Sequence, residues 1–411
     1  GVGDGVYGVQ MGPFGVGDSV SYTERATDSD GNTYTRAWAN SFQVLEPFVQ
    51  TADILFVPDY GGNDTDWFRP HFTNALDDLG YAYDVWDTGL RGAPDSAILD
   101  LYTSGVVIWA APYWGYVTDR WSTTPAPAAL QAYLDAGGKL FISGQNVAQG
   151  LDGTTLLSDY LHASYVQGDT GLYALLGAAG DPISDGLTLN ISGGDGANNQ
   201  YDTDEIDPLS PAVTVFTYDT TAVTALAEPV RPEVTGPERE RGEPGAVPVP
   251  WDEHEKELKQ SAEAEAAAGL AGVISSGTAG LRVDTGTYKV VYFAFGFEGI
   301  NSRGDRAVVM ERVLAWLRGV LPRPTQISPA DGSAVPVGDV TFTWTWVAGA
   351  TGYQVQIDAM DTFDSPALIE DTLTDSSYTI TLSSGTWYWR VRALPDGTYT
   401  SAWQVRAAGP V

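Results

Sequence analysis

The stretch KLFISGQNVAQGL, residues 139–151, joins an apolar strand to a helix through a sharp turn. Lys139 to Ser143 form a short apolar run typical of a buried strand, and the Gly144 that follows allows a tight turn. In α/β folds a nucleophile is often displayed at such a strand-to-helix joint. This joint has the side-chain amides of Gln145 and Asn146 at that place instead, so it is either a catalytic site of another kind or a structural element.

Strands and helices alternate on both sides of this joint, between residues 50 and 320. Alternation of this kind predicts an α/β domain with a doubly wound parallel sheet, as in flavodoxin-like folds. The predicted strands cover residues 52–60, 83–88, 104–114, 139–143 and 288–300, and the predicted helices cover 67–81, 127–138 and 306–321.

Period-2 patterns typical of β-strands flank this domain. Residues 1–48 suggest about three strands, too few for a sandwich of about seven, so the missing strands lie upstream in a longer precursor or come from another chain. Residues 335–408 follow a Pro-rich linker and predict a complete β-sandwich. The predicted domains are therefore 1–48, 49–322 and 323–411, and the Pro/Glu-rich and helix-prone insertion at 228–268 is expected to be a solvated arm, a lid or a docking element.

The chain is strongly acidic and has no cysteine. Its 21 Lys and Arg stand against 53 Asp and Glu, a net charge of −32, which excludes nucleic acid and anionic membrane as partners. No run of 18 apolar residues occurs, so no membrane span is expected, and without cysteine there is no disulfide, thiolate metal site or Cys nucleophile. Together with the many Gly, Thr, Ser and Trp residues, this composition predicts an extracellular protein, secreted or at the cell surface. The first residues lack the pattern of a signal peptide, which predicts a mature or cut end.

A crevice at the carboxyl ends of the parallel strands is the predicted binding site, because ligands of open parallel sheets bind there. Aromatic faces beside amide and carboxylate groups suit a sugar or a peptide. In the alternative interpretation the same groups satisfy one another beneath the loops. The residues that follow the predicted strands are Asp59, Tyr60, Asn63, Tyr113, Trp114, Gln145, Asn146, Glu298 and Asn301.

Calcium is the one cofactor predicted, because two segments concentrate hard oxygen ligands. The first lacks the downstream Glu of an EF-hand loop, and both also have the composition of ordinary turns and loops. The candidate ligands are Asp28, Asp30 and Asn32 in ATDSDGNTY, and Asp195, Asn198, Asn199, Asp202 and Asp204 in GGDGANNQYDTDEID.

A hydrolase is the least favoured alternative. The three histidines, His71, His162 and His254, do not fall into a recognisable triad pattern, and HEKEL at 254–258 has Leu258 where a zinc protease needs its second histidine. Accidental carboxylate pairs are so numerous among 53 acidic residues that they neither support nor exclude a glycosidase. The tryptophans near the C-terminus are expected in the sandwich core, with a sugar-stacking strip as the alternative.

Around GGKLFISGQNVA, residues 137–148, the middle domain resembles the class I glutamine-amidotransferase-like fold. That family has Cys at the turn and a His and a Glu after a late strand. Here amides occupy the turn where that family has Cys, and Phe297 precedes Glu298 in FGFEGI where a His-containing motif is expected. Of the three residues of that pattern, only the Glu is therefore matched in this chain, by Glu298. Because a neighbouring base cannot activate a carboxamide into a nucleophile, no catalytic residue is predicted in this chain.

A second resemblance covers most of the chain outside the insertion. GGKLFISGQNVA, LLSDYLHASYV, GGDGANNQYDTDEI and AGLRVDTGTYKVVYFAFGFEGI resemble a module in the C-terminal regions of secreted bacterial peptidases of the subtilisin-like and immune-inhibitor-A-like kinds. GVYGVQM with SVSYTERATDSDGNTYT resembles the second half of an Ig-like domain. The last domain, with Trp344 or Trp346, Tyr353, WYWRVRA and SAWQVR, resembles a fibronectin type III domain.

These resemblances imply a non-catalytic accessory region that contacts protein or glycan at the cell surface, with any peptidase domain upstream of Gly1. The alternative from another class is a structural subunit of a filament or surface layer. In that case a neighbouring copy completes the N-terminal strands by strand addition, so the chain self-associates.

Overall fold

The computed structural model describes residues 12–27, 30–35, 40–60, 67–112, 117, 126–221, 277–395 and 403–410. The chain divides into two compact units, residues 1–50 with 231–270, and residues 51–230 with 271–411. The break after residue 50 lies close to the first domain boundary predicted from the sequence. The predicted insertion at 228–268 lies outside the described residues.

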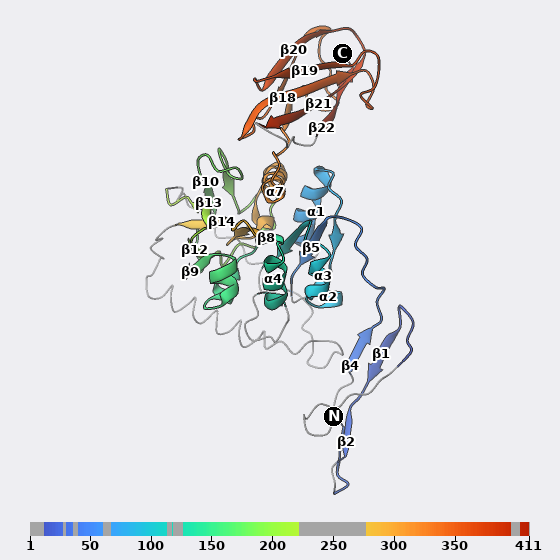
Figure 1. Ribbon diagram of the computed structural model, residues 1–411, viewed down its shortest axis with the longest axis vertical. Helices are drawn as coiled ribbons and strands as arrows, with labels where there is room; N and C mark the ends of the chain where they lie inside the picture. The colour runs from blue at the N-terminus through green and yellow to red at the C-terminus, as the bar shows by residue number, and fades with distance from the viewer. Residues whose placement is uncertain are drawn as a thin grey trace. The chain divides into compact units, whose positions relative to one another are not determined.

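In the described part of the first unit, four short strands form two separate pairs (Figure 1). Strand β1, Ser19–Tyr22, pairs antiparallel with β4, Asn40–Gln43, and β2, Arg25–Thr27, pairs with β3, Thr33–Thr35. Phe42 contacts Phe14 and Tyr22 edge-to-face, with ring centroids 5.9 and 6.3 Å apart. None of the side chains described between residues 12 and 50 is buried, so these strands form no core of their own in the described part of the unit.

A nine-stranded mixed sheet forms the centre of the second unit, in the order β11-β10-β13-β14-β15-β8-β7-β5-β6 (Figure 1). Five neighbouring strands are parallel: β15, Lys289–Phe293; β8, Lys139–Ser143; β7, Val106–Ala110; β5, Ile54–Pro58; and β6, Asp84–Val85. The other four are antiparallel: β14, Thr278–Asp284; β13, Val213–Tyr218; β10, Ala174–Gly177; and β11, Thr188–Asn190. A separate antiparallel pair consists of β9, Ala163–Gln167, and β12, Glu205–Pro208.

The prediction of a parallel sheet is therefore wrong for β14, β13, β10 and β11, which form the antiparallel half of the nine-stranded sheet. Strands β14 and β15 are joined by a four-residue turn, and a turn that short can connect only antiparallel strands. The parallel prediction holds for the strands that alternate with helices, where β5 and β7 are buried along their whole length.

Helices cover both faces of the parallel half. Alternate strand residues such as Phe56, Ile108 and Phe141 form one core with α1, Arg69–Asp78, and α7, Arg303–Arg318. On the opposite face α3, Ser96–Asp100, packs against α4, Ala126–Asp135, and α4 contacts the π-helical turn η1, Leu156–Tyr160. The remaining helical segments are α2, Thr88–Arg91; α5, Val147–Leu151; and the 3₁₀ turn η2, Phe297–Gly299.

Helix α7 closes this domain with strong signals at both ends. The Ser302 side chain accepts a hydrogen bond from the Asp305 N–H at the N-terminus, and Gly319, with φ 70°, ends the helix in the left-handed conformation. Glu311 on α7 accepts hydrogen bonds from the Arg323 guanidinium, and both side chains are largely buried. This ion pair anchors the segment that leaves the helix.

The last domain is built from two antiparallel sheets. One contains β16, Gln326–Ser328; β17, Gly338–Trp344; and β20, Ser377–Leu382. The other contains β19, Ile369–Leu373; β18, Ala350–Asp358; β21, Thr386–Pro395; and β22, Gln404–Pro410. Trp344 and Trp389 are buried between the sheets with Phe342 and Tyr353, as expected, but Trp346 is 59% exposed.

The close approach of β8 and β7 gives a direct test of the fold. A Cβ at Gly144 would lie 1.7 Å from the Ala111 carbonyl oxygen, so Gly144→Ala is expected to destabilise the protein by more than about 3 kcal/mol. At Gly304, in the first turn of α7, the nearest atom would be 3.7 Å away, and Gly304→Ala is expected to stabilise by about 0.5–1 kcal/mol. Urea unfolding measures both; similar effects of the two substitutions would contradict the strand packing.

Candidate functional site

The carboxyl ends of β5, β7, β8 and β15 lie side by side, because these strands are parallel neighbours. Of the predicted crevice residues, Gln145 and Glu298 are brought together through one shared partner, Asn199, whose carbonyl oxygen accepts from Gln145 and whose side-chain amide donates to Glu298. Asp59 follows β5, two strands along the edge from β8. Asn63, Tyr113 and Trp114 lie outside the described residues.

Gln145 is 1% exposed, and its side-chain amide is fully used by the backbone around it. Nε2 donates to the carbonyl oxygens of Pro112 (2.8 Å) and Asn199 (2.6 Å). Oε1 accepts from the backbone N–H groups of Tyr201 (2.8 Å) and Asp202 (2.9 Å). The amide therefore joins the turn after β8 to the end of β7 and to the 199–202 loop.

Asn146 occupies the sharpest point of the turn after β8. Its backbone is left-handed, with φ 63° and ψ 6°, and it directly precedes α5. Asparagine is one of the few non-glycine residues that adopt this conformation readily. Its side chain is 2% exposed, and Nδ2 has no hydrogen-bond partner among the described residues.

The first N–H groups of α5 are occupied by a carboxylate of the chain itself. Oδ2 of Asp204, which is fully buried, accepts from the N–H groups of Ala148 (2.9 Å) and Gln149 (3.1 Å). Burial raises the pKa of Asp204 well above its usual value, and these two hydrogen bonds oppose that shift. In enzymes with a nucleophile at this joint, a backbone N–H beside it serves the oxyanion hole. Here the neighbouring N–H groups serve an internal cap.

Glu298 is also fully buried, at the end of β15. Oε1 accepts from the side-chain amides of Asn199 (2.7 Å) and Gln200 (3.2 Å), while Oε2 has no partner among the described residues. Burial raises the pKa of Glu298 from 4.5 to about 7 despite these two hydrogen bonds. A carboxyl with one oxygen unpaired in a buried site is more stable in its protonated form.

The remaining described crevice candidates have structural partners. Asp59 is fully buried and accepts from the Trp109 indole N–H (2.8 Å) and the Val117 backbone N–H (2.9 Å). Tyr60 packs against Trp67 with ring centroids 5.6 Å apart. The Asn301 side chain donates to the Ser192 carbonyl oxygen (3.2 Å). These contacts are what the alternative interpretation of the crevice predicts.

The calcium candidates of the second segment contact separate partners. Asp195 pairs with Arg306 (3.0 Å), Asn198 accepts from the Gly193 N–H (2.7 Å), and Asn199 bonds Glu298. Within the described ranges no three His, Asp or Glu side chains gather as a metal site. Asp202, Asp30 and Asn32 have further contacts of their own, and Asp28 lies outside the described residues. Calcium binding stays a prediction.

The two described histidines, His71 and His162, contact residues outside the joint at 139–151. His71 is on α1, and burial, followed by the charge of Arg306, lowers its pKa to about 4. The His162 ring lies 3.0 Å from the Tyr288 hydroxyl, and burial lowers its pKa as well. His254 lies outside the described residues.

Gln200 and Ser143 are buried participants that the sequence reasoning missed. Gln200 Oε1 accepts from the Gly296 N–H (2.6 Å), and Ser143 Oγ bridges the Phe295 carbonyl oxygen (2.9 Å) and the Phe297 N–H (2.7 Å). Gln200 and Glu298 are 98 positions apart, so no spacing in the sequence could indicate their contact. Ser143 could have been identified from the sequence as a residue at this edge, because it ends the apolar run that predicts the strand.

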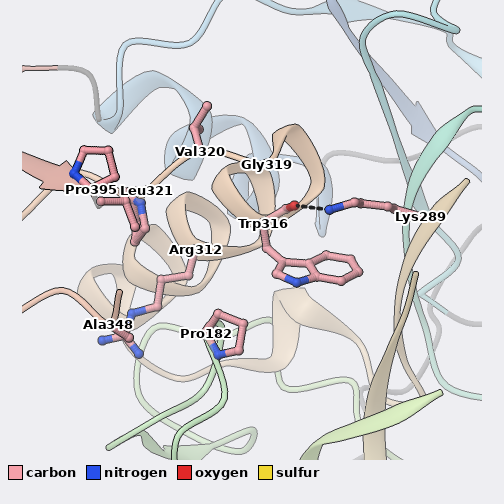
Figure 2. A pocket seen from close by; sticks show the side chains of 10 residues that line it. Pro182, Lys289, Arg312, Trp316, Gly319, Val320, Leu321, Ala348 and Pro395 are labelled. Carbon is pink, nitrogen blue, oxygen red and sulfur yellow. Dashed lines mark hydrogen bonds between the residues drawn. The ribbon is translucent and has the colours of Figure 1, made fainter. Parts of the chain in front are cut away.

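A concavity of about 290 Å³ lies beside α7, away from the strand-end residues (Figure 2). Lys289 Nζ lies 4.7 Å from the centre of the Trp316 ring, donates to the Trp316 carbonyl oxygen (3.3 Å) and pairs with Asp284 (3.2 Å). Arg312 donates to the carbonyl oxygens of Ile183 and Asp185. Both cations that line the concavity, Lys289 and Arg312, are thus held by contacts within the chain, and none of the predicted site residues lines it.

Comparisons with known proteins do not assign the chain to a family. No family model and no curated protein matches it. Among solved structures it is similar to the fn3 domain of human collagen alpha-1(XX) chain, with 22% identity, 22% of this chain and 86% of that chain covered, and a TM-score of 0.18. It is also similar to the cytoplasmic proteins STM3548 and STM1381 of Salmonella typhimurium, each with 9% identity over 74% of this chain and 97% of the other, with TM-scores of 0.35 and 0.34.

The structure agrees with the expectation about membrane spans as far as it extends. None of the helices in the described part of the chain has the length and apolar character needed to cross a bilayer.

Replacement of Gln145 by Glu tests its role as a bridge. The variant keeps the shape but loses the N–H donors that face the Pro112 and Asn199 carbonyl oxygens, so it is expected to destabilise by about 3–5 kcal/mol at neutral pH. The control is Gln131→Glu, on the surface side of α4 and with the same charge change, which is expected to shift stability by no more than about 0.5 kcal/mol. Equal effects in urea unfolding would contradict the bridge.

Glu298 gives a prediction for the dependence of stability on pH. Because its folded pKa of about 7 exceeds 4.5, the folded state holds an extra proton between these values, and the free energy of unfolding falls as pH rises through that window. The loss is about 3 kcal/mol and is complete above the folded pKa. In Glu298→Gln this loss is absent, so the variant should gain stability relative to the wild type between pH 4.5 and 8. The measurement is urea unfolding of both proteins at several pH values. A difference in the free energy of unfolding that stays constant with pH would contradict the raised pKa of Glu298.

Proposed function

We propose that this chain is a non-catalytic accessory region of a secreted or cell-surface protein, acting through contacts with protein or glycan. Its middle domain is proposed to be an amidotransferase-like, flavodoxin-like α/β domain that has lost its nucleophile, and its last domain a fibronectin type III-like sandwich. The observation that carries the proposal is the amide of Gln145, whose donors and acceptor are all bonded to the backbone at the joint where such a fold would display its nucleophile.

Three further features support a structural role for the joint. The chain has no cysteine, and Ser143 is hydrogen-bonded on both sides by backbone groups. The N–H groups that start α5 bind Asp204. Neither described histidine hydrogen-bonds a residue of the joint, so neither of these imidazoles is placed to activate a hydroxyl there.

The surface charge supports the proposed partner class. At a net charge of −32, the long-range field repels nucleic acid and anionic lipid, which leaves proteins and neutral glycans as the simplest partners. The proposed association with a peptidase, the extracellular location and the calcium sites come from the sequence patterns and the resemblances.

A structural subunit is the second candidate, favoured by one observation on the first unit. Its described strands pair only two by two and bury none of their described side chains, while Tyr34 is 73% exposed and Phe42 41% exposed. A neighbouring copy could complete these strands by edge pairing, which would make the chain a component of a filament or surface layer.

A panel of electrophilic probes for serine, threonine, lysine and carboxylate nucleophiles tests the accessory proposal. The purified chain is expected to form no stoichiometric adduct within residues 139–151 or at Glu298 in peptide mass spectra, because none of the residues described there is an activated nucleophile. A serine hydrolase treated in parallel is the positive control. A specific adduct within residues 139–151, lost in Glu298→Gln, would favour the hydrolase, and long polymers of the unlabelled chain in light scattering would favour the structural subunit.

A further inference from the structure

Two arginines lie next to each other on the outer face of the four-stranded sheet of the last domain. Trp389, Val391 and Ala393 of β21 point into the sandwich core, so the alternate residues Arg390 and Arg392 point away from it. Both arginine side chains are half-buried.

Aromatic rings and glutamines fix the two guanidinium groups. The Arg390 Cζ lies 4.2 Å from the centre of the Phe363 ring and 4.5 Å from the centre of the Trp403 ring, and the Arg392 Cζ lies 4.5 Å from the centre of the same Trp403 ring. Each Nε donates to a glutamine of β18 over 2.7 Å, Arg390 to Gln356 and Arg392 to Gln354. The guanidinium planes are therefore held in place before any partner binds.

Neither guanidinium has an acidic partner among the described residues. Every described hydrogen bond of the pair uses Nε and a neutral amide, which leaves the Nη groups of both arginines available. Arg303, Arg306, Arg318 and Arg323 each pair with Asp or Glu, as expected in a chain with 53 acidic residues. Burial and the neighbouring Arg392 charge lower the pKa of Arg390, the charge of Glu370 opposes that shift, and the Glu370 carboxylate is hydrogen-bonded to Gln356.

The chemistry of the pair selects its partner. A guanidinium edge binds a carboxylate with two parallel hydrogen bonds. Alternate residues of a strand are about 6.6 Å apart, and the same spacing separates alternate side chains of any extended peptide. Arg390 and Arg392 are alternate residues of one strand whose guanidinium groups both stack on the Trp403 ring, so they follow one another in the same order as two carboxylates at positions i and i+2 of an extended chain.

We propose that Arg390 and Arg392 form a docking surface for an extended acidic peptide segment with carboxylates on alternate residues. The observations that carry this inference are the stack on Phe363 and Trp403 and the lack of an acidic hydrogen-bond partner for either guanidinium among the described residues. It extends the proposed accessory role by naming a class of protein partner, and the two can fail separately. A covalent adduct at the β8 joint would overturn the accessory role alone, and loss of peptide binding would overturn the docking surface alone.

The experiment measures fluorescence anisotropy of labelled peptides with the whole chain. The probe is a fluorescein-labelled Glu-Thr-Glu-Thr-Glu peptide, compared with its equally charged isomer Glu-Glu-Thr-Thr-Glu, which has no two carboxylates on alternate residues, and with the neutral Gln-Thr-Gln-Thr-Gln. Arg390→Gln with Arg392→Gln is expected to weaken binding of the alternating peptide at least about tenfold, because two charge-assisted contacts are lost. The matched control is Arg303→Gln with Arg318→Gln, which removes the same charge from arginines that have acidic partners, and it is expected to bind like the wild type.

Arg392→Lys keeps the positive charge but removes the planar guanidinium that binds a carboxylate through two hydrogen bonds. This variant tests the docking surface if the double variant is unstable. It is expected to bind the alternating peptide several-fold more weakly while its thermal unfolding stays close to the wild type. Equal binding by wild type and the arginine variants, equal binding of the two charged isomers, or no binding by the wild type would overturn the proposal. Preferential binding of a sulfated oligosaccharide over the alternating peptide would overturn it too, since the surface would then recognise a different class of polymer.

Discussion

The side-chain amide of Gln145 ties the joint after β8 to two other parts of the α/β domain. Its four hydrogen bonds reach the end of β7 and the 199–202 loop, and all of them are with backbone groups. The same loop supplies Asn199 and Gln200 to Glu298, and Asp204 to the start of α5. Buried polar groups are costly unless they are paired, so this loop and the joint must pack as one structure. The carboxyl edge of the sheet is thus filled with polar side chains from the chain itself.

The sequence predicted the parallel half of the sheet because long apolar runs there alternate with amphipathic helices. Strands β5, β7, β8 and β15 and helix α7 all lie where that pattern placed them. The antiparallel half was missed for two reasons. Strand β11 has three residues and β10 has four, and neither shows a clear apolar run. Strands β13 and β14 are longer, but Thr, Gly or Arg residues interrupt their apolar pattern. The strand content of the last domain was predictable from its regular alternation, and the exposure of Trp346 was not, because it follows the end of β17.

The candidate site was predictable in its location but not in its contacts. The strand-end rule identified Asp59, Gln145 and Glu298, which are all buried at the carboxyl edge. Asp204 looked like a metal ligand because short polar residues and glycines suit a calcium loop and a capping loop equally well. Its contact with α5 joins residues 56 positions apart, and only the fold shows it. The last domain adds a contrast in charge, since a chain of net −32 presents two fixed arginines that pair with glutamine rather than with acid.

The most direct test of the packed joint is hydrogen exchange at four backbone amides, those of Tyr201, Asp202, Ala148 and Gln149. Gln145 accepts from the first two and Asp204 from the others. If these side chains hold the joint closed, the four amides exchange slowly, within about tenfold of the amides in β8. Exchange at the rates of an exposed loop would show that the crevice opens to solvent, and the structural role assigned to Gln145 would be wrong.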